Sequence, residues 1–129
     1  MGDLTKNISK DEIKCNCGCG LDRMSRGTLS VVQMVRDHFG KAVRINDANH
    51  CGCRCESHNA KVGGSERSEH LPDEDGVCHA IDFHVEDVPN IEVYGYIDGV
   101  FPNGLGLGLY NSFVHVDDRL AKARWDLRN

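Results

Sequence analysis

The chain has 129 residues and a net charge of −5, from fifteen basic and twenty acidic residues. This length suits one domain, and the composition, 40% hydrophobic and 27% charged, excludes a disordered chain. The acidic balance argues against nonspecific binding to nucleic acid, and no apolar run reaches the roughly 20 residues that span a bilayer. We therefore expect neither nucleic acid nor a membrane as a partner.

Residues 1–14 are polar and predict a loosely held arm, followed by a single domain over residues 15–129. The arm has no apolar stretch, so we expect no signal peptide and synthesis in the cytoplasm. Seven cysteines in so short a chain are typical of secreted disulfide scaffolds, but the number is odd and we expect no export signal. The composition therefore favours thiols or metal ligands over a disulfide framework.

The first half of the chain predicts one helix and one short strand. The helix covers residues 28–39, with Thr28 as its cap and Gly40 as its end. Its apolar residues recur at helical spacing: Leu29, Val32, Val35 and Phe39. A strand over residues 42–46 precedes a polar stretch from 47 to 69, and stretches of that length inside compact domains are often functional.

The second half begins with residues 78–85, where apolar and polar side chains alternate as in a strand. A second helix is expected from about residue 88 to 97, with Asp87 as its cap and Gly99 as its end. The glycine-rich run that follows predicts a turn into a last strand over residues 112–117.

The tail, residues 118–129, is expected to form a helical turn in which Trp125 covers the core. The order of elements is helix, strand, long loop, strand, helix and strand. It predicts an α+β fold with a small, mainly antiparallel sheet and helices packed on it.

Three residues of this pattern carry the chemistry of a metal site: His70, Asp82 and His115. Asp82 and His115 each lie inside a predicted strand between apolar neighbours, and His70 ends the long polar stretch. An aspartate in that setting is costly unless it is paired or bound to a cation. Two imidazoles and one carboxylate are a catalytic zinc set with a position open for water. The alternative is a satisfied core histidine and an aspartate that caps a turn or pairs with an arginine.

Several separated motifs occur along the chain: Ser68-Glu69-His70, Ala80-Ile81-Asp82, Phe113-Val114-His115-Val116-Asp117, the upstream Arg54, His58-Asn59 and Val62-Gly63-Gly64, the Cys-x-Cys-Gly-Cys near the N-terminus, and Gly-Leu-Gly-Leu-Tyr before the last strand. Together, and in the same order, they resemble the zinc D-Ala-D-Ala metallopeptidases, a family of peptidoglycan carboxypeptidases and phage endolysins that share the hedgehog-type fold. The resemblance covers residues 15 to 125, nearly the whole chain.

The resemblance implies a hedgehog/DD-peptidase-like α+β fold with one catalytic Zn²⁺ held by His70, Asp82 and His115. Arg54 would bind the carboxylate or carbonyl of the substrate, for which a guanidinium is suited. Ser68 would support the substrate or the first ligand. The implied function is hydrolysis of peptide bonds in cell-wall peptidoglycan through a metal-activated water, as a D-Ala-D-Ala carboxypeptidase or an endolysin-type endopeptidase. The stem peptide would be the partner of a monomer that reaches the cell wall by phage-type release.

The chain departs from the family pattern in the spacing of its first two ligands. Asp82 follows His70 by twelve positions, where the pattern has seven. A loop over residues 71–77, inserted before Cys78, would restore the later part of the motif. The ligand set survives this change, because a metal constrains positions in space rather than along the sequence.

A second departure concerns the general base. Many relatives carry an acid or a histidine two or three residues before the second zinc histidine, and here those positions hold serine and phenylalanine. Asp117, on the strand face of His115, is the first candidate for the base. It could equally orient His115 or pair with Arg119. His84, which shares a strand face with the predicted aspartate ligand, is another candidate.

Six of the cysteines form two clusters: Cys15, Cys17 and Cys19, and Cys51, Cys53 and Cys55; Cys78 stands alone. The clusters can hold a second, structural metal, form disulfides or remain thiols that fill gaps in the core. A tie between them would order the loop that carries Arg54. Two other functions are therefore open: a non-catalytic zinc-containing module of peptidoglycan binding or phage structure, and a cysteine-rich metal or redox protein.

Overall fold

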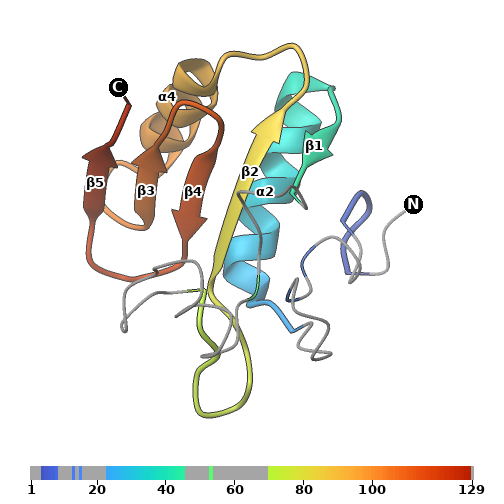
Figure 1. Ribbon diagram of the computed structural model, residues 1–129, viewed down its shortest axis with the longest axis vertical. Coiled ribbons are helices and arrows are strands. Elements are labelled where there is room, and N and C mark those ends of the chain that lie inside the picture. Colours follow the sequence, from blue (N-terminus) through green and yellow to red (C-terminus); the bar gives the residue numbers. More distant parts are fainter. Residues whose placement is uncertain are drawn as a thin grey trace.

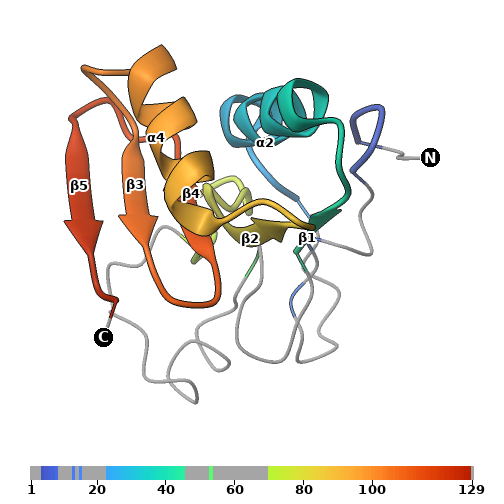
Figure 2. The same ribbon diagram turned by 90° about the horizontal axis from the view of Figure 1, so that it is seen from above.

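A computed structural model describes residues 4–8, 13, 15, 23–45, 53 and 70–128 of the chain. Within these residues, two helices pack on one face of a five-stranded mixed sheet whose strand order is β1-β2-β4-β3-β5 (Figure 1). The view from above shows both helices on the same side of the sheet (Figure 2). The predicted α+β class is confirmed. None of the described helices is both long enough and apolar enough to cross a membrane.

Helix α2, Arg26–Phe39, lies along the back of the sheet and begins two residues before its predicted start. The predicted cap is wrong: Ser25 is the cap, and its Oγ accepts the backbone N–H of Thr28 at 3.2 Å. Thr28 is buried instead, and its hydroxyl donates to the carbonyl oxygen of His79 at 2.6 Å. Gly40 ends the helix as predicted, because its φ of 64° lies in the left-handed region that favours glycine.

Helix α4, Asn90–Val100, starts and ends later than predicted. Pro89 stands at its N-cap, where a fixed φ suits the start of a helix. Asp87, the predicted cap, lies in the preceding turn with a φ of 62°. Gly99, the predicted end, lies inside the last turn of the helix.

Three predicted strands are present but shorter. They are β1, Val43–Arg44, β2, Ala80–Val85, and β4, Val114–Asp117. Strands β1 and β2 are antiparallel, and so are β2 and β4. Alternate residues of β2 and β4 face the helices and belong to the core, as the pattern predicts.

Two strands were not predicted: β3, Gly106–Leu109, and β5, Ala123–Asp126. Strand β3 pairs antiparallel with β4, while β5 is parallel to β3 at the sheet edge. The glycine-rich run predicts a turn, but in β3 Leu107 and Leu109 alternate with glycines and are buried in the core. The helical turn predicted for the tail is therefore wrong, since that segment completes the sheet.

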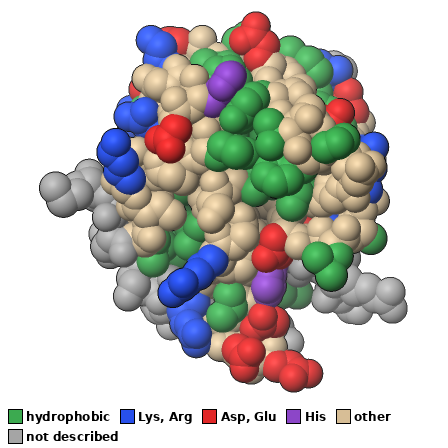
Figure 3. Space-filling view, turned by 180° about the vertical axis from the view of Figure 1, so that it is seen from behind, with side chains coloured by type: hydrophobic (Ala, Val, Ile, Leu, Met, Phe, Trp, Pro, Cys, Tyr) green, Lys and Arg blue, Asp and Glu red, His purple; other side chains and the backbone are tan. Residues whose placement is uncertain are grey.

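The core lies between the helices and the sheet. It includes Ile8 and Ile13 from the residues that predict a loosely held arm, and both are at most 1% exposed. Figure 3 views the helix side, where apolar side chains gather at the surface between charged ones. The opposite face of the sheet carries the polar residues that the sequence singles out.

Candidate metal centre

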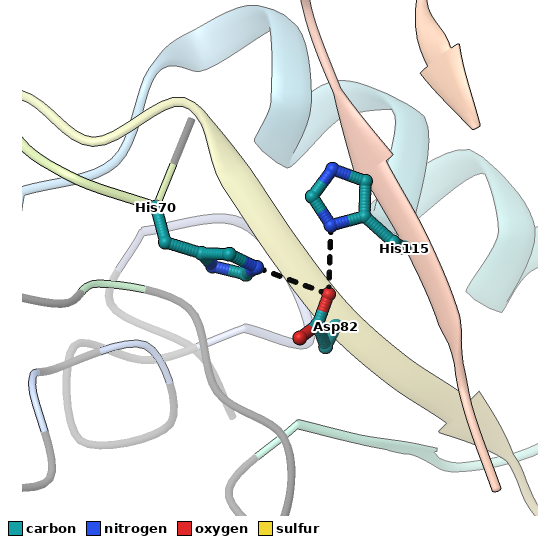
Figure 4. A group of neighbouring side chains, drawn as sticks. All are labelled: His70, Asp82 and His115. Carbon is teal, nitrogen blue, oxygen red and sulfur yellow. Dashed lines mark hydrogen bonds and ion pairs between the residues drawn. The ribbon is translucent and has the colours of Figure 1, made fainter. Parts of the chain in front are cut away.

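The three predicted metal ligands lie together on the face of the sheet away from the helices. Nε2 of His70 lies 3.1 Å from Oδ1 of Asp82, and Nδ1 of His115 lies 2.9 Å from the same oxygen (Figure 4). One ligand atom from each residue lies within 4.8 Å of the others. Among the described residues, this is the group of histidines, cysteines and acids with metal-binding geometry. We call these three residues the ligand group.

Strand register brings two members of the ligand group together. Asp82 of β2 and His115 of β4 are direct partners across the sheet, and both side chains are buried, with 3% and 8% of their surface exposed. His70, 2% exposed, comes from the segment that leads into β2. The sheet therefore positions one imidazole and one carboxylate, and the preceding segment adds the second imidazole.

The loop predicted as an insertion explains how the ligand group forms despite its unusual spacing. Oδ1 of Asp73 accepts the backbone N–H groups of Asp75 and Val77 at 2.9 and 3.1 Å. Gly76 takes a φ of 76°, and its N–H donates to the carbonyl oxygen of Asp73. These hydrogen bonds close the loop on itself. The extra residues therefore form a separate turn between His70 and Asp82, and neither ligand is displaced.

Two glycines of β3 make room beside the ligand group. The register places Gly108 between His115 and Trp125, and Gly106 next to Asp117. A Cβ on Gly108 would collide with the Trp125 indole, and one on Gly106 would collide with the Asp117 carboxylate. The sequence prediction for Trp125 is therefore wrong: its indole lies on the site face, with its ring centroid 5.1 Å from that of His115.

Asp117 contacts the ring nitrogen of His115 that faces away from Asp82. Nε2 of His115 lies 2.8 Å from Oδ2 of Asp117, which is fully buried. The same carboxylate accepts bonds from Nε and Nη2 of Arg119, at 2.7 and 2.8 Å, and from the N–H of Gly106 at 3.2 Å. Both oxygens are thus engaged by donors. This arrangement favours the orienting role for Asp117, one of the roles that the sequence left open.

The electrostatics of the site favour a positive charge between its carboxylates. Burial alone would raise the pKa of Asp82, but the charge of His70 and the bonds from both histidines hold it well below its usual range. Burial would lower the pKa of His115, yet Asp117 and Asp82 together raise it to about 9. A cation among these groups would supply the charge that a proton on His115 otherwise provides.

The donor set fits a zinc ion. Two imidazole nitrogens and one carboxylate oxygen form the ligand set of catalytic zinc sites, which keep a further position open for water or substrate. Since all three donors converge on one point and are desolvated, they need little rearrangement to hold a cation.

The remaining predicted site residues fall into two sets. Arg54, Ser68, Cys17, Cys19, Cys51 and Cys55 lie outside the described residues. Cys15, Cys53 and Cys78 are described and buried in the core, and Cys53 Sγ lies 3.3 Å from the carbonyl oxygen of Arg23. A second, structural metal at the cysteines has no support among the described residues.

Sequence reasoning missed the surroundings of the ligand group. Trp125 donates its indole N–H to the hydroxyl of Tyr110 at 2.9 Å, and the Arg119 guanidinium lies 5.5 Å from the Trp125 ring centroid. The available signal was the alternation of glycine and leucine before the last predicted strand. Glycines at every second position of a strand indicate that neighbouring side chains lie over them.

Comparison with known proteins adds one finding. A family model described as Peptidase M15 matches residues 6–117. No curated protein and no solved structure matches the chain. The matched range contains the whole ligand group together with Asp117.

Proposed function

The chain belongs to the peptidase M15 family, and on that premise we propose that it is a zinc peptidase of bacterial cell-wall peptidoglycan. The family implies a metallopeptidase that uses zinc. The proposed reaction is hydrolysis of a stem-peptide bond, as a D-Ala-D-Ala carboxypeptidase or an endolysin-type endopeptidase. The observation that carries the proposal is the convergence of His70 and His115 on one buried oxygen of Asp82. Its place of action would be the cell wall, reached by phage-type release.

The ligand group would hold the zinc. When bound, zinc supplies a Lewis acid that polarises the scissile carbonyl and lowers the pKa of water. Burial of the ligand side chains keeps them desolvated, which strengthens their interaction with a cation. Arg54 and Ser68 remain in the proposal as substrate-binding residues.

Asp117 and Arg119 would orient His115. With the proton of His115 on Nε2, that nitrogen donates to Asp117, and Nδ1 presents its lone pair toward the ligand group. Arg119 keeps the carboxylate ionised and fixed through two charge-assisted bonds. We assign Asp117 this positioning role in preference to that of general base, because donors occupy both of its oxygens.

The test is cleavage of purified peptidoglycan and of its soluble muropeptides, followed by mass spectrometry. The zinc-loaded protein is expected to release peptide fragments, to lose activity on chelation and to regain it with zinc. His70→Ala should abolish cleavage, while Ser30→Ala on the exposed face of α2 should leave it unchanged.

Two outcomes would contradict this function. Cleavage that persists in His70→Ala would remove the ligand group from the reaction. Zinc binding and sedimentation with peptidoglycan without release of any fragment would instead identify a non-catalytic binding module.

A further inference from the structure

A cavity of about 690 Å³ opens at the end of the sheet where β2 and β3 end and β4 begins, at the top of Figure 1. Its lining includes residues 88–91, which lead into α4 and form its first residues, and residues 110–112, which lie between β3 and β4. His84 and Arg128 also line it. Its volume falls within the range of about 300–1,000 Å³ that ligand pockets occupy.

Strand β2 connects this cavity with the ligand group. His84 follows Asp82 by two positions in the same strand, so both side chains lie on the same face. Two residues of a strand span about 7 Å. His84 lines the cavity, so the cavity begins about two residues of extended chain beyond the candidate metal centre.

A row of aromatic side chains makes a second, independent connection. The Trp125 indole lies next to the His115 ring and donates to the Tyr110 hydroxyl at 2.9 Å. Tyr110 lines the cavity, and its ring stacks on Phe113 with centroids 4.3 Å apart. Two neighbouring routes thus lead across one sheet face from the ligand group to the same cavity.

The cavity lining is uncharged on balance and mixes polar with apolar groups. Its guanidinium, Arg128, is neutralised by Asp126, with Nη2 and Oδ2 2.8 Å apart. Asn90 and Ser112 bring amide and hydroxyl groups, whereas Ile91 brings apolar surface. Such a lining suits the amide groups of a peptide backbone and small side chains, and its guanidinium is already paired with Asp126.

From this placement we infer that the cavity is a substrate subsite that takes an extended peptide segment of small uncharged residues, beginning about two residues from the bond that is cut. The inference rests on the proposed function, because it treats the ligand group as the place of cleavage. Binding in the cavity would fix the register of the chain across the ligand group. It would thereby favour longer substrates over short ones, since contacts far from the reacting bond add to transition-state binding.

The kinetic test fills the cavity with one side chain. Ser112→Phe is compared with wild type and with Ser30→Phe, which places the same group on the exposed surface of α2. The substrates are a capped dipeptide that contains the bond cut by wild type and the same sequence extended by three residues. Ser112→Phe is expected to lower kcat/KM about tenfold on the extended peptide and to leave the dipeptide unchanged. Ile91→Tyr, at a side chain that is 48% exposed, is the second filling variant.

A binding measurement separates this inference from the proposed function. Trp125 is the only tryptophan of the chain and bonds to the cavity-lining Tyr110, so its fluorescence reports on the cavity. In the presence of chelator, a capped alanine pentapeptide, whose residues are small and uncharged, should change the fluorescence of wild type and Ser30→Phe saturably. Binding to Ser112→Phe should be at least about fivefold weaker.

Each other outcome overturns the subsite. If wild type and both filling variants have equal kcat/KM on the extended peptide, the cavity is not a substrate subsite. The cleavage of that peptide would still support the proposed peptidase function. Equal peptide affinity of Ser112→Phe and wild type, or no saturable signal, would overturn the subsite even if no peptide were cut. Saturable binding of the uncharged glycan disaccharide in place of the peptide would overturn the assignment of the occupant.

Discussion

Two clusters of histidine and aspartate lie among the residues that the structure describes, and they differ in how their side chains meet. In the ligand group, two imidazoles face one carboxylate oxygen. In the second cluster, one imidazole lies between two carboxylates: His79 Nε2 is 2.7 Å from Asp73, and Nδ1 is 2.9 Å from Asp118. The first arrangement is convergent and the second is divergent.

Burial follows the same division. The side chains of the ligand group are at most 10% exposed, whereas those of His79, Asp73 and Asp118 are 27%, 39% and 26% exposed. Convergent buried donors create a place for a cation, because a buried carboxylate is costly unless a positive charge lies beside it. In the second cluster, the imidazole of His79 already pairs with both carboxylates, so no further cation is needed there. The same residue types therefore form a candidate metal site in one place and a pair of partly exposed ion pairs in the other.

The largest expected effect comes from removing the carboxylate of the convergent cluster. Asp82→Asn should lose zinc and reduce peptidase activity to background, because the only acid of the ligand group loses its charge. Asp118→Asn, the matched change in the divergent cluster, should keep both. Zinc stoichiometry by elemental analysis and the muropeptide assay measure the two properties. Equal zinc content in the two variants would erase the distinction between the clusters.

The next effect concerns the support of the ligand group. Asp117→Asn should weaken zinc binding or activity about 10- to 100-fold, since partners that orient a metal-bound histidine have effects of that size. Glu86→Gln, which breaks the exposed ion pair with Arg44, is the control. Titration against a chelator of known affinity gives the zinc affinity. Wild-type affinity and activity in Asp117→Asn would rule out the positioning role.

A smaller effect is expected from crowding the site face. Gly108→Ala would place a methyl group against Trp125 and should lower the free energy of unfolding by about 1–3 kcal/mol. Gly99→Ala, in α4 with no atom within 4 Å of the new Cβ, should not destabilise the protein. Urea unfolding, followed by Trp125 fluorescence, compares the two. Equal stability of both variants would show that Trp125 does not lie over β3.

The smallest expected effect is a pH dependence of stability, and it arises from the second cluster, in which His79 lies between Asp73 and Asp118. Burial lowers the pKa of His79, but its bonds to Asp73 and Asp118 outweigh this and raise the pKa above its ordinary value. The bond from His79 is the main cause that lowers the pKa of Asp73. The ion pairs therefore stabilise the fold most below the unfolded pKa of histidine, about 6.5, and lose this contribution as pH rises through the folded pKa.

At the acid end, the Asp73 contribution is lost as pH falls through its lowered pKa. His79→Gln should therefore lower the melting temperature by a few degrees near pH 6 and by less near pH 9. A difference that grows with pH would contradict the charged state of His79.

Sequence patterns predicted the ligand group and the elements that carry two of its members. Alternation around Asp82 and His115 predicts that each points away from the core, because a strand with one apolar face places every second residue on the other face. Alternation does not extend to His70, which the family resemblance supports as the third ligand. Helix α2 was equally readable from its apolar spacing, although Ser25 rather than Thr28 caps it. These features depend on residues close together in the chain.

The parts that were missed depend on residues far apart. Strand β3 exists because Gly106 and Gly108 accept the side chains of Asp117 and Trp125 from neighbouring strands, and glycine alone suggests a turn. Strand β5 depends on parallel pairing at the edge of the sheet, for which a short polar segment carries little signal. The place of Trp125 beside His115 could not be predicted from its position in the sequence or from its residue type.

The most direct test of the central claim is anomalous scattering at the zinc edge from crystals of the zinc-loaded protein. The account predicts one strong peak at about 2.0–2.2 Å from the nitrogens of His70 and His115 and from the Asp82 carboxylate. It predicts no peak between the carboxylates of Asp73 and Asp118. A zinc peak at the cysteines, with none at the ligand group, would contradict the account and support the cysteine-rich metal protein instead.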